Sequence, residues 1–266
     1  FPLLGEGESL EVLAAASAAW GKGRGTWPTM TVSARIACVE RFLTGMTAAR
    51  ETVVERLCWE IAKSRPDAER EFDRTVAYVR DTLSAAKELD RASSRFQQVD
   101  GILAQVRRAP LGVTLCMGPY NYPLNETFTT LLPALVMGNP VIVKPAKHGV
   151  LLFEPLLAPF RDAFPPGVVN TLFGDGKTIV GPVVATGQVD VLAFIGSSRV
   201  ADTIRRGHPK PHRMRCVLGL EAKNVAIVTA SADLDLAVRE CLAGSLSFNG
   251  QRCTAIKLVA VARAVE

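Results

Sequence analysis

A glycine followed by two serines could bind a phosphate group in the segment VLAFIGSSRVADTIRR. The apolar run ends at Ile195, and Gly196 and Ser197 then open a stretch with helical periodicity. The first N–H groups of a helix lack partners within the helix, and together with the helix dipole they favour an anion. Ser197 could equally act only as a helix cap, a common role for serine. The dinucleotide motif GxGxxG is absent, so another arrangement would have to hold nucleotide phosphates.

A lysine stands at the end of a second apolar run, in VMGNPVIVKPAKHG. The buried strand predicted there would deliver Lys144 to its carboxyl end, and Pro145 would turn the chain at once. A lysine so placed could donate hydrogen bonds to ribose hydroxyls or phosphate, although it could also be a solvated surface charge. Because Lys144 and the Gly196–Ser197 pair belong to neighbouring strand–helix units, their combination favours a nucleotide site.

The chain has six cysteines, at positions 38, 58, 116, 216, 241 and 253. They form no CxxC pair, no Cys/His spacing typical of zinc and no dense disulfide framework. We therefore expect reduced thiols, as in cytoplasmic proteins, and no metal site. Cys38, Cys58, Cys116 and Cys241 lie within apolar or helical runs and are predicted to be core cysteines.

A scaffold of strands and helices must position these residues. From Leu10 to about Asp90, apolar residues recur three and four positions apart, which predicts mostly amphipathic helix. Five later apolar runs each enter a turn and then a helical stretch: VTLCMGP, PVIVKPA, VVNTLFGDG, VLAFIGSS and NVAIVTA. This alternation predicts an α/β fold with right-handed parallel βαβ units and the ligand at the carboxyl ends of the strands.

Composition and charge argue against several classes of partner. The net charge of +5 is spread along the chain without a Lys/Arg tract, which suits small anionic ligands better than nucleic acid. The most apolar stretch, Leu131 to Val143, is interrupted and shorter than the roughly 20 residues that a membrane helix needs. No signal peptide is recognisable, so we expect a cytoplasmic protein without a nucleic-acid or membrane partner. The chain begins without Met and ends on a predicted strand, so we also expect a fragment.

Five segments carry a resemblance that covers nearly the whole chain: GPYNYPLNETFTTLLPALVMGNPVIVKPAKHG, FPPGVVNTLFGDG, VDVLAFIGSS, LEAKNVAIV and FNGQRCTAIK. Together they resemble the aldehyde dehydrogenase superfamily. The resemblance implies a three-layer α/β fold with a parallel nucleotide-binding sheet and N-terminal helices. It also implies a small-molecule aldehyde substrate and a homo-oligomer, a dimer or tetramer, built partly by a β excursion.

The resemblance assigns catalytic residues. FNGQRCTAIK matches the family's cysteine signature, which implies that Cys253 is the nucleophile. Its thiolate would add to the aldehyde to give a thiohemiacetal, hydride would leave for the nicotinamide, and water would hydrolyse the resulting thioester. The match PYNYPL implies that Asn121 stabilises the substrate oxygen, as an oxyanion-hole donor worth about 3 kcal/mol. From its local sequence alone, Asn121 would be only a turn residue.

The same match implies the cofactor-binding residues. Lys144 would contact the adenosine ribose, and Gly196 and Ser197 would lie at the pyrophosphate. Many NAD-dependent members have a glutamate three residues after the lysine, where this chain has Lys147. Since a cation there would attract a 2′-phosphate, we expect NADP to be preferred over NAD.

The residue that activates the hydrolytic water is left open by the match. Most members carry ELGGK, whereas this chain has GLEAK. A gapless alignment from Cys253 back to Lys223 puts Gly219 at the glutamate's position and Glu221 two residues later. Either Glu221 acts through a locally altered loop, or the base is another group, for instance one beyond Glu266.

A finer resemblance, to non-phosphorylating glyceraldehyde-3-phosphate dehydrogenases, rests on Asn-Tyr-Pro at Asn121, Gln-Arg before the cysteine, and EFDRT. By match, Arg74, Tyr122 and Arg252 would bind the substrate phosphate, since guanidinium groups bind phosphate bidentately. Arg74 could instead be a solvated helix charge paired with Glu71 or Asp73. Two alternatives remain: an aldehyde dehydrogenase for an uncharged or carboxylate-bearing aldehyde, and a nucleotide-binding pseudoenzyme.

We expect four segments along the chain. Residues 1–100 would form the N-terminal helical part of the nucleotide-binding domain, 101–110 the β excursion, 111–246 the NAD(P)-binding βαβ core, and 247–266 the start of a truncated catalytic domain. The three histidines lie in polar, loop-like contexts, and we assign them no catalytic role. His208 and His212, which flank prolines in RRGHPKPHR, are predicted to lie on a surface connection.

Overall fold

The computed structural model describes residues 1–266 as two compact units, Phe1–Gly219 and Leu220–Glu266. The first unit contains a five-stranded sheet with the order β5-β4-β3-β6-β7. Its strands are β3 (Thr114–Met117), β4 (Val141–Lys144), β5 (Val169–Thr171), β6 (Val191–Gly196) and β7 (Arg215–Leu220). The pairs β3/β4, β3/β6 and β4/β5 run parallel, which confirms the predicted parallel sheet.

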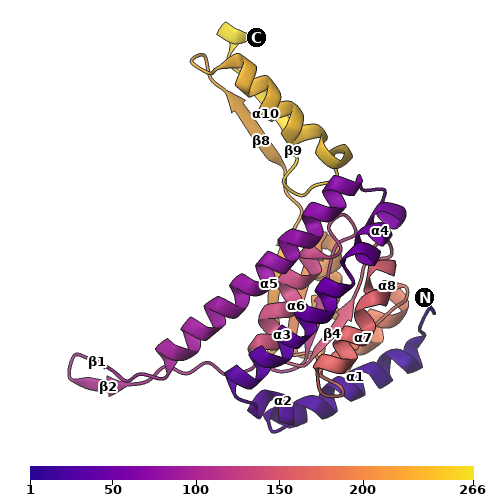
Figure 1. The fold of residues 1–266 in the computed structure, drawn as a ribbon, viewed down its shortest axis with the longest axis vertical. Helices are drawn as coiled ribbons and strands as arrows, with labels where there is room; N and C mark the ends of the chain where they lie inside the picture. The colour runs from indigo at the N-terminus through magenta and orange to yellow at the C-terminus, as the bar shows by residue number, and fades with distance from the viewer. The chain divides into compact units, whose positions relative to one another are not determined.

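Helices pack on both faces of this sheet (Figure 1). Successive strand residues point to opposite faces. Accordingly, Cys116 and Val143 belong to one apolar cluster, which includes residues of α3 to α7, while Leu115 and Ile142 belong to a second, which includes residues of α1, α8 and α9. The predicted three-layer α/β fold is confirmed. The helices are α1 (Glu6–Trp20), α2 (Thr26–Thr29), α3 (Val32–Ala48), α4 (Arg50–Ile61), α5 (Arg65–Ser93), α6 (Asn125–Val136), α7 (Glu154–Ala163), α8 (Gly176–Ala185) and α9 (Ser198–Gly207), with 3-10 turns η1 (Gly21–Gly23) and η2 (Leu151–Phe153).

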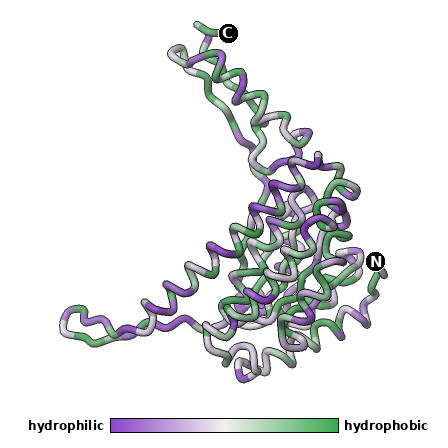
Figure 2. The backbone as a smooth tube through the Cα atoms, in the orientation of Figure 1, coloured by the Kyte–Doolittle hydropathy of each residue, from purple (hydrophilic) through white to green (hydrophobic).

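The long helix α5 connects the N-terminal helices to the layer that packs on the sheet. Its first turn is capped by the Ser64 side chain, which accepts from the backbone N–H of Asp67. Its buried apolar positions recur every three to four residues, as at Phe72, Val76 and Val79. Hydrophobic and hydrophilic residues therefore alternate along α5 (Figure 2).

A short hairpin, β1 (Gln97–Val99) and β2 (Ile102–Ala104), projects beyond the end of α5 (Figure 1). Its turn residues Asp100 and Gly101 have φ of 49° and 79°. An Asp-Gly pair with two positive φ values matches the right-handed twist of the strands, which favours a two-residue hairpin. The hairpin begins at Gln97, four residues before the predicted excursion at Gly101.

The second unit contains a parallel pair, β8 (Asn224–Val228) and β9 (Ile256–Val261), and the helix α10 (Leu234–Leu246). The short 3-10 turns are η3 (Ser247–Gly250) and η4 (Arg263–Val265). We expected the NVAIVTA run to continue the nucleotide-binding sheet. Instead β7, whose sequence RCVLGL we had not assigned to a strand, takes the place beside β6, and β8 pairs with β9.

No helix in either unit combines the length and the apolar character that crossing a membrane requires.

His208 does not lie on the surface as predicted, because its side chain is buried with 2% exposure. Its Nδ1 accepts from the backbone N–H of Lys210 at 3.0 Å, and its Nε2 lies 3.1 Å from the carbonyl oxygen of Val189. These two backbone partners replace the water that a polar ring would otherwise need. His212 is exposed, in agreement with the prediction.

Candidate active site

Three of the predicted site residues lie at one edge of the sheet in the first unit. β3 pairs with both β4 and β6, and the register aligns Met117 with Lys144 on one side and with Phe194 on the other. Lys144 ends β4, Gly196 ends β6, and Asn121 lies in the loop that follows β3. The carboxyl edge of a parallel sheet is where open α/β folds bind their ligands.

Lys144 is not the solvated charge of our alternative interpretation, because its residue is only 7% exposed. Its Nζ donates to the carbonyl oxygen of Pro145 at 2.9 Å. Burial lowers the pKa of Lys144, and the nearby carboxylate of Asp175 opposes that shift. An ammonium group is thus held at the end of β4, while Lys147 lies exposed in the following loop.

The Gly196–Ser197 turn connects β6 directly to the N-terminus of α9. A Cβ on Gly196 would lie 2.4 Å from the ring of Phe194, so a larger residue would displace this turn or the ring. Ser197 occupies the N-cap position, but its side chain makes no capping hydrogen bond. The helix-cap alternative therefore does not describe this serine, and the first turn of α9 keeps the properties of an anion site.

The loop that carries Asn121 and Tyr122 is packed tightly on both sides. At its start, a Cβ on Gly118 would lie 1.8 Å from the Oγ1 of Thr127. On its other side, a Cβ on Gly149 would lie 2.4 Å from the Cβ of Pro123. Protein interiors at this density leave little freedom for backbone movement, so both neighbours restrict where Asn121 can lie.

Arg74 is exposed on α5, and both carboxylates proposed as its partners are engaged elsewhere. Asp73 accepts from the Nε and Nη2 of Arg50 at 2.9 and 2.8 Å. Glu71 forms a buried ion pair with Lys63. Because Glu71 also contacts the start of α6, and residues three apart share a helix face, Arg74 lies on the side of α5 that faces the Tyr122 loop.

Cys253 lies in the second unit, where it is exposed. The amide nitrogen of Asn224 donates to the carbonyl oxygens of Cys253 at 2.7 Å and Ala255 at 3.0 Å. Its neighbour Arg252 donates from Nη1 to the hydroxyl of Ser247 at 3.0 Å. The cysteine loop is therefore held by the first residue of β8, and Arg252 is bound to a neutral group.

Glu221 is exposed, within the loop that leads into β8. The register aligns Asn224 with Ile256, so Glu221 and Cys253 each precede the aligned pair by three residues. Since β8 and β9 are parallel, both residues lie on segments that enter the small sheet from the same end. This placement is compatible with Glu221 as the base, and that role stays a prediction.

The remaining cysteines differ from Cys253 in their surroundings. Cys38 and Cys116 are buried, as predicted. Burial raises the pKa of Cys116 to about 12, which keeps its thiol protonated at neutral pH. Cys58 and Cys241, which were also predicted to be core cysteines, are only partly buried, and Cys216 is exposed.

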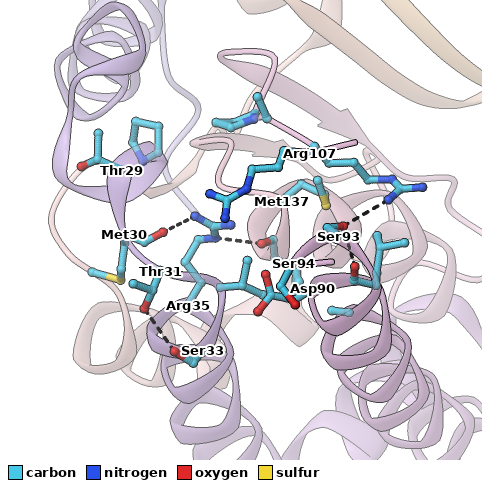
Figure 3. Close-up of a pocket in the computed structure, with 18 residues that line it drawn as sticks. Thr29, Met30, Thr31, Ser33, Arg35, Asp90, Ser93, Ser94, Arg107 and Met137 are labelled. Carbon is cyan, nitrogen blue, oxygen red and sulfur yellow. Dashed lines mark hydrogen bonds between the residues drawn. The ribbon is translucent and has the colours of Figure 1, made fainter. Parts of the chain in front are cut away.

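A pocket elsewhere in the first unit does not coincide with this edge of the sheet. It has a volume of about 580 Å³ and is lined by residues of α3, the end of α5 and the segment before β3, among them Arg35 and Arg107 (Figure 3). The buried Arg35 side chain donates to the carbonyl oxygens of Met30 and Val136. Pro110 and Met137, which also line the pocket, precede β3 and β4, so it lies at the opposite, amino end of these strands.

Comparison with known proteins assigns the family. The model of the aldehyde dehydrogenase family matches residues 4–266, almost the entire chain.

The chain belongs to the aldehyde dehydrogenase family.

Members of this family are NAD(P)-dependent oxidoreductases, and individual relatives differ in substrate. An NADP-dependent glyceraldehyde-3-phosphate dehydrogenase from Streptococcus equinus is 40% identical over 160 residues, covering 60% of this chain and 33% of that protein. A malonate-semialdehyde dehydrogenase 2 from Shouchella clausii is 28% identical over 266 residues, covering 99% of this chain and 53% of that protein. The chain thus spans about half the length of the curated relatives that match it end to end.

A similar fold is found in the crystal structure of an NADP-dependent glyceraldehyde-3-phosphate dehydrogenase from Bacillus halodurans complexed with NADP. The TM-score is 0.89 and the identity 30%, and the match covers 99% of this chain and 55% of that chain. This family member confirms the predicted aldehyde dehydrogenase fold.

Asn224, Lys63 and Glu71 were not among the residues predicted for the site. Asn224 stands in the quoted segment LEAKNVAIV, but nothing in its local sequence shows that it bonds to a loop 29 residues later. Lys63 and Glu71 are both charged residues in a helical region, where exposure is the usual expectation. Only their complete burial distinguishes them from surface charges.

Proposed function

We propose that this chain binds the cofactor and supplies the nucleophile of an enzyme that oxidises an aldehyde to a carboxylate with NADP. One observation carries the proposal. Asn121, Lys144 and Gly196 lie at or just after the carboxyl ends of three adjacent parallel strands, at one edge of the sheet. The family resemblance requires an oxyanion donor and two cofactor contacts at these positions.

The residues at this edge fit a dinucleotide phosphate. The N-terminus of α9, without a side-chain cap, suits the pyrophosphate, and Lys144 suits the adenosine ribose. Lys147, exposed after β4, suits a 2′-phosphate, which supports NADP over NAD. NADP, when bound, supplies the acceptor for the hydride.

The residues of the chain account for the other steps. The thiolate of Cys253 forms a carbon–sulfur bond with the aldehyde carbon, and Asn121 donates a hydrogen bond to the oxygen that becomes negative. Loss of hydride leaves a thioester on Cys253. Glu221, in our proposal, takes a proton from the water that attacks this thioester, and the thiolate leaves as the carboxylic acid forms.

We propose glyceraldehyde 3-phosphate as the aldehyde and 3-phosphoglycerate as the product. The names of two similar proteins support this substrate. Arg74 is exposed while its neighbouring carboxylates are paired elsewhere, and Arg252 is bonded to a neutral hydroxyl. Neither charge is paired with a carboxylate in these contacts, so both suit a phosphate, with Tyr122 as a further donor.

The test measures NADPH formation by the full-length protein with glyceraldehyde 3-phosphate, unphosphorylated glyceraldehyde and succinic semialdehyde. We expect the highest kcat/KM for the phosphorylated aldehyde. Arg74→Met should raise its KM without affecting unphosphorylated glyceraldehyde. Arg80→Met, an exposed arginine on the same helix, is the matched control and should change neither value.

A carboxylate-bearing aldehyde is the second candidate, because the match to the malonate-semialdehyde dehydrogenase covers 99% of this chain. A higher kcat/KM for succinic semialdehyde would favour it. Absence of NADPH formation with every aldehyde would favour the pseudoenzyme. The homo-oligomer, the cytoplasmic location and the boundaries of the four predicted segments stay predictions.

A further inference from the structure

A buried ion pair lies behind the Asn121–Tyr122 loop and has no role in the chemistry described so far. It joins the ammonium group of Lys63, between α4 and α5, to the carboxylate of Glu71 on α5. Both side chains have 0% exposure. Taking two charges out of water is costly, and neutral residues of similar volume often stabilise a fold as well or better. Stability alone is therefore a weak explanation for this pair.

The carboxylate of Glu71 fixes the point where the loop ends and α6 begins. Its Oε1 accepts from the backbone N–H groups of Leu124 at 3.0 Å and Asn125 at 3.1 Å. Leu124 is the N-cap residue of α6 and has no side chain that could cap the helix. Glu71 supplies this cap from another helix, with a negative charge at the positive end of the α6 dipole.

Lys63 connects this cap to Tyr122. Its Nζ lies 3.5 Å from the centroid of the Tyr122 ring, in a cation–π contact. A desolvated ammonium on one face of the ring holds the ring plane and polarises the phenol hydroxyl as a hydrogen-bond donor. Because its side chain is not exposed, Lys63 would act on a substrate through Tyr122 and the loop rather than by direct contact.

We propose that Lys63 and Glu71 are positioning residues that hold the Asn121–Tyr122 loop and orient the Tyr122 ring for aldehyde binding. This inference rests on the proposed function for its effect on catalysis. That Lys63 and Glu71 restrain the Tyr122 ring and the loop is a separate claim, and it can be tested without measuring catalysis.

The test uses the full-length protein and the double variant Lys63→Met/Glu71→Gln. Glutamine keeps an oxygen acceptor for the N–H groups of Leu124 and Asn125, and methionine keeps most of the lysine volume without its charge. The double variant should therefore unfold at a urea concentration close to that of the wild type. The single variant Lys63→Met should be less stable, because it leaves Glu71 buried without its partner.

Two measurements on the double variant decide the proposal. In protein labelled with 3-fluorotyrosine, the ¹⁹F resonance of Tyr122, assigned with Tyr122→Phe, should shift, while that of Tyr78, on α5, stays in place. The kcat/KM for glyceraldehyde 3-phosphate should fall about tenfold or more, because small misplacements of binding groups slow catalysis strongly.

The control variant Lys87→Met/Glu40→Gln removes an exposed ion pair, 2.9 Å long, between α5 and α3. It should change neither measurement. A double variant with wild-type stability, an unchanged Tyr122 resonance and unchanged kcat/KM would overturn the proposal. If the wild type oxidises no aldehyde, the proposed function fails, and the ¹⁹F shift alone decides whether the pair orients Tyr122.

Discussion

At the scale of single residues, the thiols of this chain differ in burial and therefore in their capacity to react. Cys116 is buried in the centre of the sheet, where desolvation raises its pKa to about 12. Cys253 is exposed in a loop whose backbone is held by the Asn224 amide. A nucleophile needs both access and a fixed backbone, and of these two cysteines only Cys253 has both.

The buried charge of Lys144 predicts a pH dependence of cofactor binding. Burial lowers the pKa of Lys144, so its ammonium loses a proton at lower pH than an ordinary lysine. NADP affinity should therefore weaken as pH rises through the alkaline range, while the same deprotonation stabilises the fold. Calorimetric titration between about pH 7 and pH 10 measures the change. Lys144→Met should bind NADP about tenfold more weakly at neutral pH, and a pH dependence that persists in this variant would assign it to another group.

If Glu221 activates the hydrolytic water, its replacement should slow the later turnovers and leave the first turnover unchanged. Replacing Glu221 by Gln removes a base but keeps a similar shape, so thioester hydrolysis should slow by about 10²-fold or more. The first equivalent of NADPH should still form at the wild-type rate in a stopped-flow experiment. An unchanged steady-state rate would exclude Glu221 as the base. Glu266→Gln, in an exposed residue of the same unit, is the control.

At the scale of elements, the loops after β3 and β4 are packed against each other. Gly149 has φ +88°, and an added Cβ would lie 2.4 Å from the Cβ of Pro123. The two loops are therefore in close contact at this point, and both carry residues of the proposed site.

This contact predicts the effect of Gly149→Ala. The substitution should reduce stability by about 1–3 kcal/mol through backbone strain and should lower kcat/KM by displacing the Asn121 loop. Urea unfolding and steady-state kinetics measure the two effects. Gly181→Ala in α8, where the added Cβ would meet no atom within 4 Å apart from its chain neighbours and the nearby backbone of its own helix, should be neutral or slightly stabilising. Full activity in Gly149→Ala would show that the loop contact does not position the site.

At the scale of the whole molecule, the β1–β2 hairpin exposes apolar residues that have no partner in the first unit's core. Ile102 and Leu103 are 68% and 67% exposed. Neighbouring exposed apolar residues are typical of a surface that binds another protein. This supports the predicted role of the hairpin in a homo-oligomer.

Leu103→Asp should therefore shift the full-length protein to smaller species, because a charge would be buried at the interface. Light scattering after size-exclusion chromatography measures the mass. Ser84→Asp is the control, since Ser84 is exposed on α5 and the variant adds the same charge outside the hairpin. An unchanged mass in both variants would exclude the hairpin from the interface.

Much of this protein could be predicted from the sequence. Most strands after Val113, although not β7, follow from short apolar runs that end in turns. The helices before Asp90 follow from their periodicity, because both signals are local. The role of Cys253 rests on a ten-residue signature, FNGQRCTAIK. These features depend on residues that are close in the sequence, so they can be predicted without any knowledge of the fold.

Only the tertiary structure decided which polar residues are buried and what they contact. Lys144, His208 and Glu71 all occur in sequences typical of surface residues, yet each is buried with partners supplied by the fold. The carboxylate of Glu71 reaches backbone N–H groups 53 and 54 residues away. Such contacts arise from the packing of α5 on α6, and the free energy of burying a charge depends on that packing rather than on neighbouring residues.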